Sequence, residues 1–255
     1  MTSTHGKFIW YELLTSDPAA AARFYAQVIG WSASAPADHG GYGHFAADGE
    51  QVAGLMALPN GAPMPAGWLG YICVDDVDAT LAAITAAGGT IHMPANDIPG
   101  TGRIAMVADP QGGVFYVMTP KGVGASTSFS MELLQRCSWN ELSTTDQNGA
   151  LAFYQGLFGW TQGDAMDMGA LGQYRFINRA DGGIGAVTPC PPGGPPTVWT
   201  YYFRVPDIDA AVARVIAAGG SIAHGPSAVP GDDHIIIGTD PQGASFALVG
   251  KRAAA

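Results

Sequence analysis

The sequence is poor in cysteine and in basic residues. Its 255 residues include three cysteines, and 11 Lys plus Arg stand against 21 Asp plus Glu, for a formal charge of −10. An odd cysteine count without close-paired spacing argues against a disulfide framework and a structural zinc site, so we expect thiols in a reducing compartment. Thinly spread positive charge argues against a nucleic-acid partner, because neutralising phosphates needs clustered Lys and Arg.

Long apolar runs are also missing. Residues 1–7 have no apolar signal core, and no window approaches the roughly 18 continuous apolar residues of a membrane span. We therefore expect a cytoplasmic protein with no membrane partner. The hydrophobic content of 47%, with 36 Gly and 18 Pro, is typical of a globular chain with many short elements joined by turns.

An internal repeat runs through the chain. Residues 8–31 read FIWYELLTSDPAAAARFYAQVIGW, and residues 137–160 read CSWNELSTTDQNGALAFYQGLFGW. In each copy a β-favouring segment ends at an Asp that can cap a helix, Asp17 or Asp146, and the helix should stop at a Gly, Gly30 or Gly159. Because the length also suits two ordinary domains, the repeat favours two.

Each half carries a second unit of strand and helix. These units are WLGYICVDDVDATLAAITAAGG (68–89) and WTYYFRVPDIDAAVARVIAAGG (199–220), and each is followed by Asp-Pro-Gln-Gly, at 109–112 and 240–243. Asp followed by Pro favours a type I turn, so these tetrapeptides are interpreted as turns between short strands.

The pattern predicts an α+β fold of four βαβββ modules paired into two cup-shaped mixed-sheet domains. A single module is too small to bury its own sheet, so adjacent modules should share a concave core. The predicted domains are 1–121 and 132–255, joined by a Gly- and Ser-rich linker at 122–131.

The chain resembles the vicinal oxygen chelate superfamily, which includes glyoxalase I, extradiol dioxygenases and bleomycin-resistance proteins, in its tandem two-domain branch. The resemblance rests on the S/T-D…FY…G-W module starts, the V-D-D-V-D-A and V-P-D-I-D-A helix starts, and the two D-P-Q-G-x-x-F endings. Together these motifs cover nearly the whole chain. They imply the fold more specifically than the function, since one fold hosts many chemistries.

The resemblance also implies where a metal would be bound. Members that use a divalent ion place His, Glu or Gln on the first, fifth and eighth strands of each cup. Here those positions hold Trp10, Leu69 and Tyr116 in one half, and Trp139, Thr200 and Ala247 in the other. These residues form no credible ligand set, so we expect no metal at the usual positions. An atypical divalent site stays open as an alternative.

One glutamate per half is the first candidate contact for a ligand. Side chains alternate along a strand, so Glu12 shares a face with Trp10, and Glu141 shares a face with Trp139. A carboxylate in an apolar cup needs hydrogen-bond partners or a function. A structural role, a role in holding a polar ligand and general-base work all stay open.

Aromatic and basic residues complete the candidates. Tyr71, Tyr116, Tyr202 and the two Trp residues either line a pocket for a flat molecule or simply fill the core. Arg103 and His234 occupy matching places before the turns and either pair with a glutamate or ligand anion or lie at a solvated edge. The remaining histidines lack metal-site spacing: His5, His39, His44, His92 and His224.

Three functions therefore compete. The first is a small-molecule binding or sequestering protein with an aromatic or polar-aromatic ligand in a cup and no usual metal triad. The second is a glyoxalase-like lyase, or a hydroxylase or dioxygenase, that uses an atypical metal site or metal-free acid and base chemistry. The third is a structural or partner-binding protein whose cups are plain cores. We expect a monomer with pseudo-twofold halves or a homodimer.

Overall fold

The same local pattern of one strand, one helix and three strands occurs four times in the fold. The computed structural model describes residues 4–34, 41–59, 61, 64–122, 126–190, 193 and 196–253. The first module contains β1 (Phe8–Thr15), α1 (Pro18–Ile29), β2 (Ser32–Ala33), β3 (Tyr42–Ala47) and β4 (Glu50–Ala57). The second contains β5 (Gly67–Cys73), α2 (Val77–Ala86), β6 (Thr90–Ile98), β7 (Gly102–Ala108) and β8 (Val114–Pro120).

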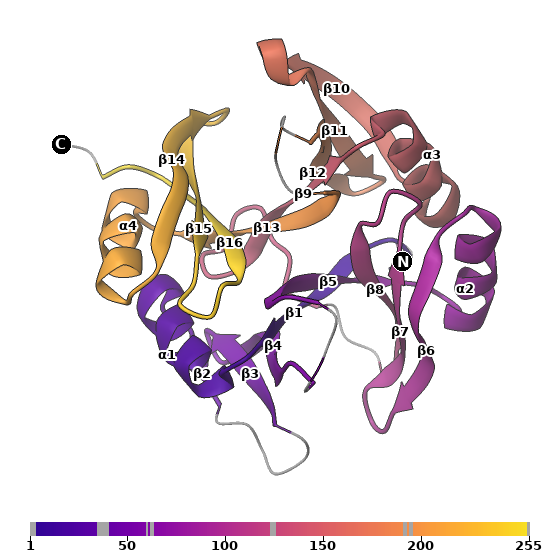
Figure 1. The fold of residues 1–255 in the computed structure, drawn as a ribbon, viewed down its shortest axis with the longest axis horizontal. Coiled ribbons are helices and arrows are strands. Elements are labelled where there is room, and N and C mark those ends of the chain that lie inside the picture. Colours follow the sequence, from indigo (N-terminus) through magenta and orange to yellow (C-terminus); the bar gives the residue numbers. More distant parts are fainter. Residues whose placement is uncertain are drawn as a thin grey trace. The chain divides into compact units, whose positions relative to one another are not determined.

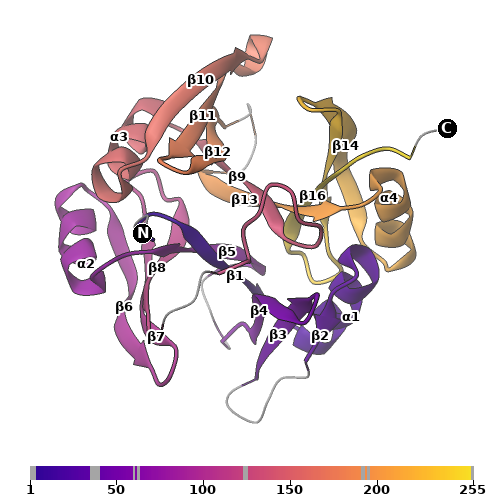
Figure 2. The same cartoon turned by 180° about the vertical axis from the view of Figure 1, so that it is seen from behind.

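The second sequence repeat folds in the same order (Figures 1 and 2). Its first module contains β9 (Cys137–Thr144), α3 (Gln147–Phe158), β10 (Thr161–Asp167), β11 (Gln173–Arg179) and β12 (Gly182–Pro189), with a short 3₁₀ turn at Gly169–Leu171. Its second module contains β13 (Val198–Val205), α4 (Ile208–Ala217), β14 (Ser221–Val229), β15 (Asp233–Thr239) and β16 (Ser245–Gly250). The predicted α+β fold of four βαβββ modules is therefore confirmed.

Helix ends follow the capping signals in the sequence. The Asp17 carboxylate accepts a hydrogen bond from the Ala20 N–H, and that of Asp146 accepts one from the Gly149 N–H, both at 3.0 Å. Helix α1 ends at Gly30, whose φ of 89° is left-handed, a conformation that costs glycine nothing. Helix α3 ends in the same way at Gly159, so the predicted bounds of both helices are confirmed.

The strands form two eight-stranded mixed sheets. Their orders are β2-β3-β4-β1-β5-β8-β7-β6 and β10-β11-β12-β9-β13-β16-β15-β14, so the second sheet repeats the first. The first strand of each repeat lies parallel to the last strand of its own module, with Glu12 opposite Gly54 and Glu141 opposite Ala186. This register fixes the neighbours of the two glutamates.

The chain packs as two compact units, each built from both sequence repeats. The central unit comprises Met1–Ile9, Gly70–Ala125 and Asn140–Trp199, and the terminal unit comprises Trp10–Leu69, Ser126–Trp139 and Thr200–Ala255. Helices α2 and α3 pack together in the central unit, and α1 and α4 pack together in the terminal unit (Figure 1). The domain boundaries expected from the sequence stay a prediction.

A buried chain of hydrogen bonds links the repeats inside the terminal unit. The Trp68 indole N–H donates to Tyr25 Oη, and the Tyr25 hydroxyl donates to the Asp240 carboxylate, both at 3.0 Å. Asp240 also accepts from the backbone N–H groups of Gln242 and Ala244. Burial raises the pKa of Tyr25 well above its ordinary value, and the nearby Asp240 charge adds to this increase.

The central unit contains the matching chain. The Trp199 indole N–H donates to Tyr154 Oη at 3.0 Å, and the Tyr154 hydroxyl donates to the Asp109 carboxylate at 2.9 Å. Both acids belong to Asp-Pro-Gln-Gly segments, where the Gly N–H bonds back to the Asp carbonyl as a turn requires. The turns are confirmed, and their carboxylates also anchor a tyrosine from the other repeat.

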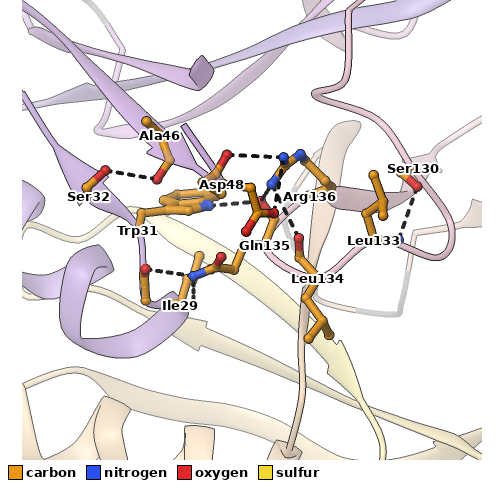
Figure 3. Close-up of polar contacts among 12 residues, drawn as sticks. Ile29, Trp31, Ser32, Ala46, Asp48, Ser130, Leu133, Leu134, Gln135 and Arg136 are labelled. Carbon is orange, nitrogen blue, oxygen red and sulfur yellow. Dashed lines mark hydrogen bonds and ion pairs between the residues drawn. The ribbon is translucent and has the colours of Figure 1, made fainter. Parts of the chain in front are cut away.

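Residues 135 and 136, which follow the expected linker at 122–131, are bound to the first module of the terminal unit (Figure 3). The Trp31 indole N–H donates to the Gln135 carbonyl at 2.9 Å, and the Gln135 amide donates to the Gly30 carbonyl at 2.6 Å, at the end of α1. Arg136, only 2% exposed, donates to the Ala47 carbonyl at 3.2 Å. These bonds hold residues 135–136 against the first module.

Candidate functional site

The partly exposed face of each sheet is the place where ligand-contacting side chains can lie. In the first module, Phe45 packs against Tyr25 of helix α1, with ring centroids 5.8 Å apart. Tyr42 and His44 alternate with Phe45 along β3, so they lie on the opposite face. We call this helix-free face the open face.

On the open face of the terminal unit, the first repeat contributes an aromatic cluster. The Trp10 indole N–H donates to Tyr42 Oη at 3.1 Å, and the His44 ring lies edge-on to both Trp10 and Tyr42. Burial lowers the pKa of His44 below its ordinary value, which favours the neutral imidazole. Glu12 and His44 both pair with Gly54, and Glu12 is only 2% exposed.

Another cluster on the open face of the terminal unit comes from the second repeat. Trp139 packs against Tyr202, Ala247 and Val249, and two isoleucines of β15 join them: Ile235 and Ile237. The structure thus brings together two of the predicted aromatic residues, Trp139 and Tyr202. They belong to an apolar cluster in which Trp139 stays partly exposed.

In the central unit, Tyr71 and Tyr116 stack face to face. Their ring centroids are 4.2 Å apart and the planes are inclined by 11°. Both are at most 5% exposed, so they fill the layer beneath this face rather than offering broad surface to solvent.

The second predicted glutamate is also in the central unit, and its carboxylate is held by a tyrosine. The Tyr174 hydroxyl donates to Glu141 Oε2 at 2.8 Å, and Phe176 packs edge-on against Tyr174. Glu141, Tyr174 and Phe176 are all partly exposed. A carboxylate has about four lone-pair sites, so it can accept a ligand's donor beside the tyrosine.

The two predicted basic residues lie off the open faces. Arg103 forms a bidentate ion pair with Asp78 of helix α2, at 2.9 Å for both bonds, and a further ion pair with Asp97. This pairing lowers the pKa of Asp78. His234 alternates along β15 with Ile235 and Ile237, so it lies on the face opposite Tyr202.

Four further residues of the open faces were not predicted from the sequence: Tyr42, His44, Tyr174 and Phe176. A signal for them exists, because YGHF (42–45) and YRFI (174–177) start with Tyr at matching places in the two repeats. Comparing the repeats beyond their first helices would have found it.

The residues at the family's usual metal positions do not fit a divalent ion. Trp10 is a hydrogen-bond donor to Tyr42, Tyr116 stacks on Tyr71, and Ala247 belongs to an apolar cluster. Within the described residues, no group of three or more His, Cys, Asp or Glu side chains is placed to hold a metal ion. His39 lies outside the described residues.

Comparison with known proteins places this architecture in a family. The family described as the Glyoxalase/Bleomycin resistance protein/Dioxygenase superfamily matches residues 7–116 and 136–248. The chain belongs to this superfamily. Its two matches correspond to the two sequence repeats, so this superfamily member is a tandem one, as the sequence predicts.

Relatives that align along most of this chain carry two different names. CFP32 of Mycobacterium tuberculosis (strain CDC 1551 / Oshkosh), named as a candidate glyoxylase, is 36% identical over 246 residues, 94% of this chain and 93% of the relative. The anthracycline biosynthesis protein DauV of Streptomyces sp. (strain C5) is 32% identical over 267 residues, 96% of this chain and 93% of the relative.

Solved structures of more distant superfamily members share the fold. A Mn(II)-bound glyoxalase from Novosphingobium aromaticivorans has a TM-score of 0.65 at 20% identity, covering 98% of this chain and 83% of its own. The 2,2',3-trihydroxybiphenyl 1,2-dioxygenase of Sphingomonas wittichii RW1 has a TM-score of 0.69 at 14% identity, covering 98% and 91%. Within the described residues, no helix has the length and apolar character needed to cross a membrane.

Proposed function

We propose that this protein binds a small hydroxylated aromatic molecule on an open face of its sheets and does not depend on the usual metal triad. The observation that carries the proposal is a carboxylate set among aromatic side chains at matching places in both repeats. Apolar walls with a few placed polar groups are typical of sites for small organic ligands.

The chemistry of the glutamates defines the ligand class. An ionised carboxylate only accepts hydrogen bonds, so its ligand must present a donor such as a phenolic O–H or an amine. The aromatic neighbours provide surface for a flat ring system, which prefers edge-to-face or offset packing. The name of the Streptomyces relatives, anthracycline biosynthesis proteins, supports testing fused aromatic phenols first.

Calorimetric titration with 2-naphthol tests this proposal, with 2-methoxynaphthalene as the matched ligand that lacks the donor. We expect the wild-type protein to bind 2-naphthol more tightly, because only the phenol can donate to a carboxylate. The double variant Glu12→Gln/Glu141→Gln should lose this preference. Equal binding of the two ligands by the wild-type protein, or an unchanged preference in the double variant, would refute the proposal.

An enzymatic role is the second candidate, and family membership together with the name of the mycobacterial relative supports it. It would be a glyoxalase-like lyase, or a hydroxylase or dioxygenase, acting through an atypical metal site or metal-free acid and base chemistry. Metal analysis of the purified protein separates the candidates. A stoichiometric divalent ion that is lost in Glu12→Ala or Glu141→Ala would favour the enzyme over simple binding.

The cellular setting is part of the same proposal. Cys73, Cys137 and Cys190 form no disulfide bond, which supports a reducing cytoplasm as the setting. The proposed partner is a small molecule rather than nucleic acid or membrane, and the protein acts as a monomer or a homodimer.

A further inference from the structure

The two glutamates occupy matching places but have different surroundings. Glu12 is 2% exposed, whereas Glu141 is partly exposed. In the first repeat the residue opposite the glutamate is Gly54, which pairs on its other side with His44. In the second repeat it is Ala186, which pairs on its other side with Phe176. The two rows of paired residues, Glu12–Gly54–His44 and Glu141–Ala186–Phe176, therefore differ at their central residue by one methyl group.

The missing methyl group allows two aromatic tips to meet over Gly54. A Cβ atom at this position would lie 2.2 Å from Tyr42 Oη and 2.9 Å from Trp10 Nε1, closer than real Cβ atoms come. The hydrogen bond between Trp10 and Tyr42 thus occupies the space that a side chain would need. It lies directly beside Glu12 in the sheet, which accounts for the low exposure of that carboxylate.

The second repeat cannot form the same closure, because the methyl group of Ala186 occupies the central place. Tyr174, which matches Tyr42, instead donates to the Glu141 carboxylate at 2.8 Å. Trp139, which matches Trp10, packs against Ala247 and Tyr202 in the terminal unit. Without a closure like the one over Gly54, Glu141 stays partly exposed.

From this comparison we infer that the second repeat alone carries the ligand contact. Glu141 accepts a hydrogen bond from the hydroxyl group of an aromatic ligand, and Phe176 offers its ring to the ligand's apolar surface. Tyr174 is a positioning residue, since its hydroxyl orients the carboxylate. Glu12 is a buried structural residue. This inference rests on the proposed function and assigns it to one of two similar sites.

Matched substitutions in the two repeats test the assignment by titration with 2-naphthol and 2-methoxynaphthalene. We expect Glu141→Gln to weaken 2-naphthol binding about 10- to 100-fold, the value of a hydrogen bond to a charged group. Binding of 2-methoxynaphthalene should change less than twofold. The matched variant Glu12→Gln should leave both affinities within twofold of wild type while lowering the melting temperature.

The role of Tyr174 needs a measurement that a purely structural effect would not change. We expect Tyr174→Phe to weaken 2-naphthol about three- to tenfold and to leave 2-methoxynaphthalene unchanged, because only the phenol uses the oriented carboxylate. An equal loss for both ligands would overturn the positioning role. Tyr42→Phe, the matched control, should affect neither ligand.

Carboxylate labelling provides a second measurement that needs no ligand. Glu141 should react with a carbodiimide and glycine ethyl ester in the native protein at least about ten times faster than Glu12, because a side chain must be accessible to react. Peptide mass spectrometry reports both sites in one sample. Equal labelling, or loss of naphthol binding through Glu12→Gln alone, would overturn the assignment and leave the proposed function intact. Failure of the wild-type protein to prefer 2-naphthol would refute both.

Discussion

Removing the Tyr25 hydroxyl should destabilise the protein strongly, because that single oxygen atom joins two buried groups. It donates to Asp240 and accepts from Trp68, and these three side chains are at most 6% exposed. Loss of a hydrogen bond to a charged group costs about 1.5–3 kcal/mol, and a buried N–H left without a partner costs about 1–3 kcal/mol. We therefore expect Tyr25→Phe to lower the free energy of unfolding by roughly 3 kcal/mol.

Calorimetry and urea unfolding measure this loss. For a chain of this size, about 1 kcal/mol shifts the melting temperature by roughly 2–4 °C, so the expected fall is about 6–12 °C. Tyr154→Phe in the central unit should cost a similar amount, and the two losses should add within about 0.5 kcal/mol, since the networks share no residue. Tyr174→Phe, at a partly exposed tyrosine, is the matched control. A loss below about 1 kcal/mol for Tyr25→Phe would contradict this account of the network.

Three further predictions concern acidity, thiols and the central glycine. Burial raises the pKa of Asp109 and Asp240 above the usual 3.8. At pH values just above 3.8 the native state therefore binds more protons than the unfolded state, and the free energy of unfolding rises as the pH falls through this range. The melting temperature of wild type minus that of Asp109→Asn/Asp240→Asn should therefore rise from pH 7 to pH 4, and a fall would contradict the burial effect. Burial raises the pKa of Cys137 to about 12. In the native protein, iodoacetamide should therefore alkylate the partly exposed Cys190 before Cys137. Peptide mapping reports the order of labelling, and early labelling of Cys137 would contradict the prediction. Gly54→Ala should cost about 1–3 kcal/mol in urea unfolding, whereas Gly67→Ala, where a Cβ meets nothing within 4 Å, should cost little; equal costs would refute the closure over Gly54.

The fold could be predicted from the sequence because its signals are local and occur twice. Asp17 and Asp146 cap their helices through bonds that span three residues, and Gly30 and Gly159 end them. Because these capping contacts join neighbouring residues, they can be recognised in the sequence without knowledge of the tertiary structure. The repetition of the pattern then allows the same order of elements to be predicted for both repeats.

The site was harder to predict, because its contacts depend on distant partners and on side-chain volume. The sequence predicts Asp240 only as a turn residue, because its bond to Tyr25 spans 215 residues and follows no spacing rule. Arg103 and His234 occupy matching places in β7 and β15, but the face on which each side chain lies depends on the register of the strands. The contrast between Gly54 and Ala186 matters because Tyr42 and Trp10 meet above Gly54, a contact between residues far apart in the sequence.

The composition of the compact units bears on how such a protein can be cut. Each unit takes one module from each repeat, so a fragment ending near residue 121 would separate Tyr25 from Asp240 and Asp109 from Tyr154. Neither half would then keep its own aromatic core intact. Co-expressed halves should instead find each other, with the severed tyrosine and aspartate pairs acting as the docking contacts of a split-protein reporter.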